Sequence, residues 1–223
     1  MNSELKKRIK TSIILLGFTI FCIFSHIGIF IIAVLVISSF AFIEISSINY
    51  RIMKNSLFLI NSLCLIYLFA IFATAALSLY KLLGPSFFFY ILSICFFSDI
   101  GGYFVGKKIG GRKITKISPN KTISGSIGSF LFSIFPLLIF NIFHENENLF
   151  SVNNFLFCLE LSLVCQLGDL FISFLKRKAK IKDTGKILPG HGGLLDRIDG
   201  IIFAIPFAYI YTIGFSNYFK LLF

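Results

Sequence analysis

The chain has 223 residues, of which 57% are hydrophobic and only 14% are charged, and its formal net charge is +11. This composition excludes an ordinary soluble domain. Apolar runs recur along the whole chain, each close to the roughly 20 residues that a helix needs to cross a bilayer. Because these runs lack the alternating pattern of barrel strands, they predict an all-α, polytopic integral membrane protein.

In chain order, the apolar runs predict about seven transmembrane helices. Only His26-Ile27-Gly28 separates the first two, and this combination of a polar residue with a flexible one predicts a tight hairpin. The sequence shows no internal repeat and no low-complexity linker, so we expect one membrane domain over residues 1–223. The predicted spans are 11–26, 28–46, 57–79, 84–106, 123–143, 151–175 and 198–216.

The basic residues gather on one predicted side of the membrane. With a cytoplasmic N-terminus, the cytoplasmic segments hold every Lys and Arg except Lys81 and Lys220. This is the positive-inside pattern, and it places the acidic turn at 144–148 on the opposite side. Since short cytoplasmic loops collect cations that contact anionic headgroups, the net charge indicates membrane lipids as partners and no nucleic acid.

The acidic residues are scarce and unevenly placed. All five Asp lie in or beside the two largest basic loops, 107–122 and 176–197. Asp99 and Asp169 sit near the ends of predicted spans, where an ionised carboxylate costs about 2.5 to 3.5 kcal/mol on insertion scales. Such residues usually mark functional sites. The alternative is a carboxylate neutralised by a nearby Lys as a packing device.

The downstream basic loop is bordered by carboxylates on both sides. Asp169, Ser173 and Lys176 are spaced i, i+4 and i+7, so on one helix they share a face. Asp196 and Asp199 follow at i and i+3, where the last span begins. Hard oxygen ligands of this kind suit Mg²⁺, which keeps water and substrate phosphate in its remaining positions. The pattern therefore predicts a Mg²⁺ site from Asp169, Asp196 and Asp199.

Between those carboxylates lies the segment 189–195, with the sequence PGHGGLL. Glycines let backbone amides approach a ligand closely, and a run of N–H groups before a helix is a ready anion site. A bare PGxGG segment would more often be a simple turn. His191 is a lone histidine, which suggests phosphate contact or a role in the loop architecture and makes it less suited to metal binding. The flanking cations favour phosphate recognition, and they are Lys176, Arg177, Lys182 and Arg197.

The upstream loop repeats the combination of carboxylate, glycines and cations. Asp99 is followed by Gly106, Gly110 and Gly111, with Lys and Arg between and after them. The GGxxxGxxxG spacing has an alternative explanation as close helix packing. In the segment SPNKT, residues 118–122, Ser118-Pro119 predicts a turn. Lys121 and Thr122 then supply a cation and a hydroxyl at the start of the next helix.

These residues resemble the signature of the phosphatidate cytidylyltransferases, also called CDP-diacylglycerol synthases. The likeness extends from about 95 to 200. The upstream part consists of Ser98-Asp99, Tyr103, Gly106, Gly110, Ile117-Ser118-Pro119, Lys121-Thr122 and Gly125. The downstream part consists of 166–170, Ser173, Lys176-Arg177, Lys182-Asp183, Gly185, Pro189 to Gly193, Asp196-Arg197 and Asp199.

The resemblance implies that CTP and phosphatidic acid react to give CDP-diacylglycerol and pyrophosphate at a cytoplasmic-facing site. It implies a Mg²⁺-dependent homodimer in the bacterial cytoplasmic membrane, with a monovalent cation beside Mg²⁺ left open. N-terminal spans would occupy 1–80 and the catalytic part about 84–216. The implied catalytic residues are Asp169, Lys176, Arg177, Asp183, His191, Asp196 and Arg197. Nucleotide and phosphate contacts would come from Ser98, Asp99, Ser118, Lys121, Thr122, Lys182, Gly190, Gly192 and Gly193. The metal would bind Asp169, Asp196 and Asp199.

The chain departs from the family pattern at a few positions. Ser124 stands where the family commonly has an acidic residue, and Gly101-Gly102 replaces a pair with larger side chains. The same pocket would also suit a CTP-dependent lipid kinase or a cytidylyltransferase acting on another lipid phosphate. From a different class, the intramembrane acids Asp99, Glu160 and Asp169 would suit an ion or proton transporter. Glu160 has no assigned role.

Overall fold

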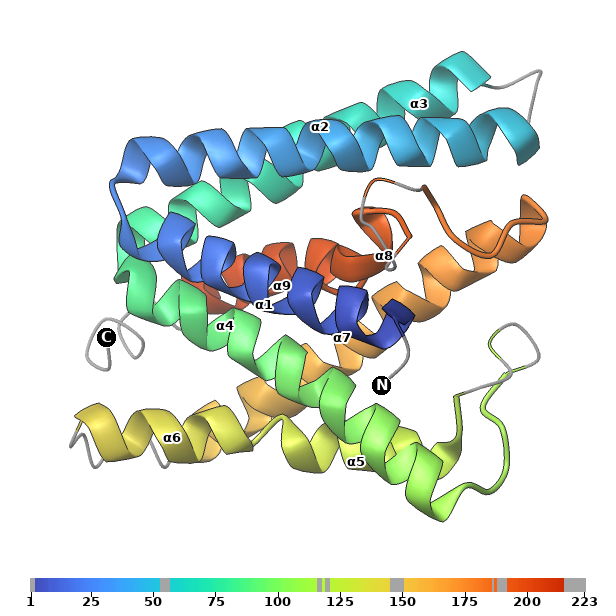
Figure 1. The fold of residues 1–223 in the computed structure, drawn as a ribbon. Coiled ribbons are helices and arrows are strands. Elements are labelled where there is room, and N and C mark those ends of the chain that lie inside the picture. The colour runs from blue at the N-terminus through green and yellow to red at the C-terminus, as the bar shows by residue number, and fades with distance from the viewer. Residues whose placement is uncertain are drawn as a thin grey trace. The chain divides into compact units, whose positions relative to one another are not determined.

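The computed structural model describes residues 3–52, 57–115, 118, 121–144, 151–185, 187 and 192–214. Over these ranges the regular structure is helical, and an isolated β-bridge pairs Lys113 with Thr122. The all-α prediction is confirmed. The chain divides into two compact units, Met1–Leu77 with Leu175–Asp199 and Ser78–Phe174 with Gly200–Phe223. Figure 1 shows the helices of these units, coloured along the chain.

Ten helical elements follow one another in the described residues, and Figure 1 labels most of them. They are α1 (Ser3–Phe24), α2 (Ile27–Ile52), α3 (Leu57–Ile66), the π-helical turn η1 (Tyr67–Phe72), α4 (Ala73–Ile109), α5 (Ile123–Phe132), α6 (Phe135–His144), α7 (Val152–Lys178), α8 (Leu195–Ile198) and α9 (Ile201–Gly214).

Five helical stretches in the described residues are long and apolar enough to cross a membrane, so the chain is an integral membrane protein. They are Ile27–Ile52, Leu57–Ile109, Ile123–Ile142, Val152–Lys178 and Leu195–Gly214. The stretch Thr11–Phe24 is apolar but shorter.

The longest of these stretches, Leu57–Ile109, has 53 residues, far more than the roughly 20 that one crossing needs. It is interrupted at Gly84, whose φ of 81° and ψ of 175° are not helical. The predicted spans 57–79 and 84–106 are therefore joined through a kink and not through a loop. Positive φ costs glycine little, which explains why the kink falls at this residue.

In the first unit, α2 is the central helix and contacts α1, α3, η1 and α8. The predicted break between the first two spans is confirmed, at Ser25 and His26, while Gly28 lies in the first turn of α2. The Gly28 N–H donates to Nδ1 of His26 at 3.1 Å. One boundary was wrong: α2 continues to Ile52, so Arg51 lies in its last turn and not in a loop from 47 to 56.

The buried face of α2 follows the helical period. Its buried residues recur every three or four positions, as expected for one stripe packed against neighbouring helices. Most are apolar or small, but one carries a carboxyl group. They are Phe30, Val34, Ser38, Ala41, Glu44, Ile45, Ile48 and Asn49.

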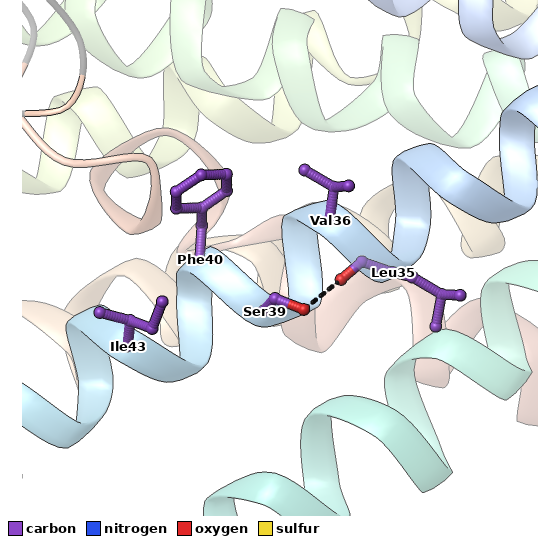
Figure 2. A pocket seen from close by; sticks show the side chains of 5 residues that line it. All are labelled: Leu35, Val36, Ser39, Phe40 and Ile43. Atoms are coloured by element: carbon purple, nitrogen blue, oxygen red, sulfur yellow. Dashed lines mark hydrogen bonds between the residues drawn. The ribbon is translucent and has the colours of Figure 1, made fainter.

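An apolar pocket lies elsewhere on α2, and Figure 2 shows its lining. It is formed by Leu35, Val36, Ser39, Phe40 and Ile43. The Ser39 hydroxyl donates to the Leu35 carbonyl at 2.8 Å, so the helix itself satisfies the one polar side chain in the lining. Such a surface suits contact with lipid chains and offers a nucleotide nothing to bind.

In the second unit, glycines allow α4 and α5 to pack closely. A Cβ added to Gly128 would lie 2.5 Å from the Val105 Cβ and 2.7 Å from the Gly101 carbonyl oxygen. A Cβ on Gly106 would lie 3.3 Å from the Cα of Gly125. The packing explanation of the GGxxxG spacing is therefore correct for Gly101 and Gly106. The predicted span 123–143 is interrupted by a turn at Ser133 and Ile134, between α5 and α6.

A chain of hydrogen bonds links α4, α5 and α7 inside the second unit. Ser98, which is fully buried, shares a 2.8 Å hydrogen bond with Ser162. Gln166 donates to the Ser162 hydroxyl at 3.3 Å and accepts from Ser126 at 2.6 Å. Buried hydroxyl and amide groups need such partners, because an unpaired polar group in an apolar interior costs free energy.

Candidate functional site

The downstream loop comprises residues 179–194, of which 186 and 188–191 lie outside the described residues. Asp196, just beyond it, holds its two ends together. Oδ2 accepts the backbone N–H of Thr184 at 2.9 Å and that of Gly193 at 3.1 Å. Oδ1 accepts from Nζ of Lys176 at 2.7 Å. The side chains of Lys176 and Asp196 are only 13% and 8% exposed, so this ion pair is largely buried.

A second carboxylate holds the same loop from α2. Glu44 is 3% exposed. Its Oε2 accepts from the Thr184 hydroxyl at 2.6 Å and from the Leu195 N–H at 2.9 Å, and its Oε1 accepts from the Leu194 N–H at 3.0 Å. Sequence reasoning missed this residue. Its position could have indicated a functional or structural role, because Glu44 is the one acidic residue in the apolar stretch Ile27–Ile52.

Two glycines of the loop allow the Glu44 carboxylate to approach the backbone. A Cβ on Gly185 would lie 2.6 Å from Oε1 of Glu44. A Cβ on Gly193 would overlap both the Glu44 carboxylate and the Thr184 hydroxyl. The predicted glycine Gly192 has a φ of 84°, a conformation that L side chains rarely adopt. Gly190 and His191 lie outside the described residues.

The other predicted residues of this region lie mostly at the surface. Arg177, Lys182 and Arg197 are exposed, and Nη1 of Arg177 donates to the Ile181 carbonyl at 3.4 Å. Asp183 is exposed as well, and a Cβ on Gly192 would lie 3.2 Å from its Cβ. The exposed cations therefore flank a loop whose framework is fixed by two buried or nearly buried carboxylates.

Asp196 and Asp199 lie where the sequence places them, at the start of the last apolar stretch. Asp196 is in the first turn of α8, and Asp199 is the C-cap residue directly after that helix. Before the loop, α7 ends at Lys178, and Lys180 has a positive φ of 57°. The Lys180 N–H donates to the Arg177 carbonyl and the Ile181 N–H to the Lys176 carbonyl, each at 3.0 Å. This closing turn ends the helix one residue after Arg177, at Lys178.

The upstream loop, residues 110–122, is held largely by its own backbone. Gly110 and Gly111 turn the chain at the end of α4, with φ of 67° and 105°. The Ile114 N–H donates to the Lys121 carbonyl and the Ile123 N–H to the Arg112 carbonyl, each at 3.0 Å. These backbone bonds bring the described residues on the two sides of the loop together.

Thr122 begins α5 as predicted. Its Oγ1 accepts the Gly125 N–H at 3.1 Å, which satisfies one of the free donors at the helix start. Ser124 donates to the Gly110 carbonyl and shares a 3.0 Å hydrogen bond with Thr122. Ser118 donates its N–H to Oγ1 of Thr115 at 3.3 Å, while Pro119 lies outside the described residues.

The predicted residues Lys121 and Asp169 form an ion pair in the second unit. Their side chains are 26% and 30% exposed, so solvent reaches both. The Ser173 hydroxyl donates to Oδ1 of Asp169 at 3.3 Å, as the i, i+4 spacing predicts. This is the Lys-neutralised carboxylate that the sequence offered as an alternative. Asp99 is exposed, in contrast to its neighbour Ser98.

The predicted metal ligands fall in different units, Asp169 in the second and Asp196 with Asp199 in the first. In the part of the chain that the structure describes, no group of three or more His, Cys, Asp or Glu side chains could hold a metal ion. The predicted ligands match Mg²⁺ in donor type, since all are carboxylates. In the structure Asp169 pairs with Lys121 and Asp196 pairs with Lys176.

Comparison with known proteins identifies the family. The sequence model of the Cytidylyltransferase family matches residues 53–215, a range that contains both charged loops. The chain is 42% identical over 134 residues to the phosphatidate cytidylyltransferase of Bacillus subtilis strain 168, covering 60% of this chain and 49% of the relative. It is 36% identical over 154 residues to the phosphatidate cytidylyltransferase of Thermotoga maritima, covering 67% and 57%.

A third relative, the phosphatidate cytidylyltransferase of Helicobacter pylori, is 41% identical over 130 residues, covering 58% of this chain and 48% of the relative. The chain thus spans about half the length of the curated relatives it matches. The family match itself covers well over half of the chain. The chain therefore belongs to the Cytidylyltransferase family.

Proposed function

We propose that the protein is a phosphatidate cytidylyltransferase, which converts CTP and phosphatidic acid into CDP-diacylglycerol and pyrophosphate. The family match over residues 53–215, with relatives that bear this name, carries the proposal. The chemistry of the two charged loops supports it, because both combine carboxylates, cations and glycines. That combination suits phosphate groups.

The proposed reaction needs little proton transfer. An oxygen of the phosphatidate phosphate attacks the α-phosphorus of CTP and forms the new P–O bond. The bond between the α-phosphorus and the oxygen leading to the β-phosphorus breaks, and its electron pair leaves with pyrophosphate. Since the nucleophile is already an anion, the difficulty is to bring two polyanions together and to neutralise the leaving group.

The cations of the chain would do most of this work. Lys121 and Lys176 are each held by a carboxylate, which fixes their position before substrate arrives. Arg177, Lys182 and Arg197 are exposed at the downstream loop and suit the phosphates of CTP. Fixed cations of this kind favour the transition state, because they need little rearrangement as charge develops.

Mg²⁺ is part of the proposal, with Asp169, Asp196 and Asp199 as its carboxylates. When bound it would neutralise negative charge on the phosphates and on the departing pyrophosphate. Lys121 and Lys176 pair with two of the same carboxylates. Removal of divalent cations with a chelator is expected to abolish turnover, and addition of Mg²⁺ to restore it.

The membrane arrangement follows from lengths and charges. Counting Thr11–Phe24 and both sides of the Gly84 kink, the helical stretches allow seven crossings. The distribution of Lys and Arg supports a cytoplasmic N-terminus and a cytoplasmic active site in the bacterial cytoplasmic membrane. CTP would enter from the cytoplasm while the lipid stays in the bilayer. We expect a homodimer, to be checked by the mass of the detergent-solubilised particle.

The test is product formation by detergent-purified protein supplied with CTP and phosphatidic acid. CDP-diacylglycerol and pyrophosphate in equal amounts, dependent on Mg²⁺, are the expected result. Glu160→Gln is the matched control for preparation and insertion, because Glu160 is an exposed carboxylate on α7 with no part in the proposed chemistry. Turnover with a lipid alcohol and none with phosphatidic acid would reject the proposed reaction and favour a lipid kinase.

A further inference from the structure

Glu44 is a buried carboxylate that lies outside the family match, nine residues before it begins at residue 53. It belongs to the first unit, as does the downstream loop that it contacts. A carboxylate buried to this extent, 3% exposed, is costly unless hydrogen bonds replace its water. Its partners in the described residues are three donors, and all of them belong to Thr184, Leu194 and Leu195.

These donors come from the two sides of the loop. Thr184 lies before the glycines, while Leu194 and Leu195 lie after them at the entry to α8. Asp196 also joins the two sides of the loop, because its carboxylate accepts the N–H groups of Thr184 and Gly193. Each carboxylate therefore joins the start of the loop to its end, and Thr184 is bonded to both of them.

The glycines make room for this arrangement. A side chain at Gly193 would overlap the carboxylate of Glu44, and one at Gly185 would lie within 2.6 Å of it. The sequence predicted Gly193 as a backbone contact for phosphate. In the structure its N–H is bonded to Asp196 and its missing side chain accommodates Glu44.

We propose that Glu44 is a positioning residue for the downstream loop, which fixes Lys176 and Asp196 for nucleotide binding without touching the substrate. The proposal rests on the cytidylyl transfer proposed above. Its physical basis is that Glu44 fixes Thr184, that Thr184 fixes Asp196, and that Asp196 fixes Lys176. Mutation of a residue that orients a site residue through a hydrogen bond, without touching the substrate, commonly lowers activity by about 10- to 100-fold.

The first test is hydrogen–deuterium exchange of the full chain in detergent, which needs no activity. In Glu44→Gln the side chain offers one acceptor oxygen, whereas the Leu194 and Leu195 N–H groups bond to different oxygens of Glu44. At least one of these amides should then exchange about tenfold faster. The matched control Glu160→Gln, an exposed residue of another helix, should exchange as the wild type does.

The second test is kinetic. In Glu44→Gln the KM for CTP should rise and kcat/KM for CTP should fall about 10- to 100-fold, with the KM for phosphatidic acid unchanged. A loss of folded protein alone would lower the active fraction and leave both KM values as they are. Thr184→Val, which removes the hydroxyl bonded to Glu44, should share the CTP effect, and Thr184→Ser, which keeps it, should restore wild-type values.

The outcomes separate this proposal from the proposed function. If the wild type makes no product but the Leu194 or Leu195 amide exchanges faster in Glu44→Gln, the proposed cytidylyl transfer is rejected. The role of Glu44 in fixing the loop then stands. If exchange and kinetics are unchanged in both Glu44→Gln and Thr184→Val, the positioning role is rejected. If Glu44→Gln fails to insert, the Thr184→Val and Thr184→Ser pair decides by the same two measurements.

Discussion

The two charged loops are of similar composition but are held in different ways. In the downstream loop, the carboxylates of Asp196 and Glu44 accept the backbone N–H groups of Thr184, Gly193, Leu194 and Leu195. In the described part of the upstream loop, the backbone hydrogen bonds run from N–H to carbonyl groups across the loop, and side chains contribute hydroxyl groups and one partly exposed ion pair. Within the described residues, buried carboxylates, which are costly unless they are hydrogen-bonded, hold the downstream loop, and backbone hydrogen bonds hold the upstream loop.

This difference indicates where substitutions should have the greatest effect. A loop held by a few buried charges loses its framework when one of them is neutralised, because the partner charge is left without compensation. A loop held by its backbone keeps its framework when a side chain changes. We therefore expect severe effects downstream and graded effects upstream.

The largest effect is expected for Asp196→Asn. The change removes the charge that pairs with Lys176, whose side chain is only 13% exposed, and breaking a buried pair costs about 3 kcal/mol or more. Turnover should be abolished and the unfolding temperature of the detergent-solubilised protein should fall, while Glu160→Gln changes neither. Near-normal activity would contradict both the role of Asp196 in the loop and its proposed role toward Mg²⁺.

A slightly smaller effect is expected for Gly193→Ala. The added Cβ would overlap the Glu44 carboxylate and the Thr184 hydroxyl, so the loop has to move away from α2. Activity should fall by at least tenfold, and the Leu194 and Leu195 amides should exchange faster, as in Glu44→Gln. Wild-type exchange in this variant would show that the close approach of Glu44 to Gly193 is absent in the protein.

Lys121→Ala is expected to lower activity without lowering stability, in contrast to Asp196→Asn. The Lys121 and Asp169 side chains are partly exposed, and ion pairs of this kind contribute less than about 1 kcal/mol to stability. The free energy of unfolding should hardly change, whereas turnover should fall at least tenfold if Lys121 contacts phosphate. A large loss of stability with proportional loss of activity would make the pair a packing device.

The smallest effect is expected for Gly110→Ala in the upstream loop. Among the described residues no atom lies within 4 Å of the added Cβ, so the expected cost is that of the φ of 67°. A left-handed conformation costs a residue with a Cβ about 1 kcal/mol relative to glycine. The unfolding temperature should fall slightly and turnover should stay close to that of the wild type. Complete inactivation would show that this turn is as tightly specified as the downstream loop.

Much of this fold could be predicted from the sequence, because hydrophobic length and charge determine membrane helices strongly. The all-α class, the break near His26 and the start of α5 at Thr122 are confirmed. Helix ends were less well predicted: α2 extends to Ile52, and a kink at Gly84 stands where a loop was expected. Local propensity carries little information about whether a chain bends or continues at such a point.

The sequence predicted which residues would gather, but not what each would contact. The i, i+4 spacing of Asp169 and Ser173 correctly predicted that their side chains meet. The ion pair between Lys121 and Asp169 agrees with the alternative explanation of Asp169 as a carboxylate neutralised by a nearby Lys. Glu44 was missed because its partners lie 140 and more positions away in the chain. No periodicity relates residues at that separation, and only the isolation of one acid in an apolar stretch pointed to it.

The group that is transferred distinguishes a cytidylyltransferase from a kinase, and an isotope label that reaches the lipid identifies this group directly. Purified protein would be given phosphatidic acid with CTP labelled either at the α-phosphorus or at the γ-phosphorus. Cytidylyl transfer predicts that only the α-label enters the lipid and that the γ-label leaves as pyrophosphate. Entry of the γ-label into the lipid would contradict this account, because it would mean that the protein transfers the terminal phosphate as a kinase does.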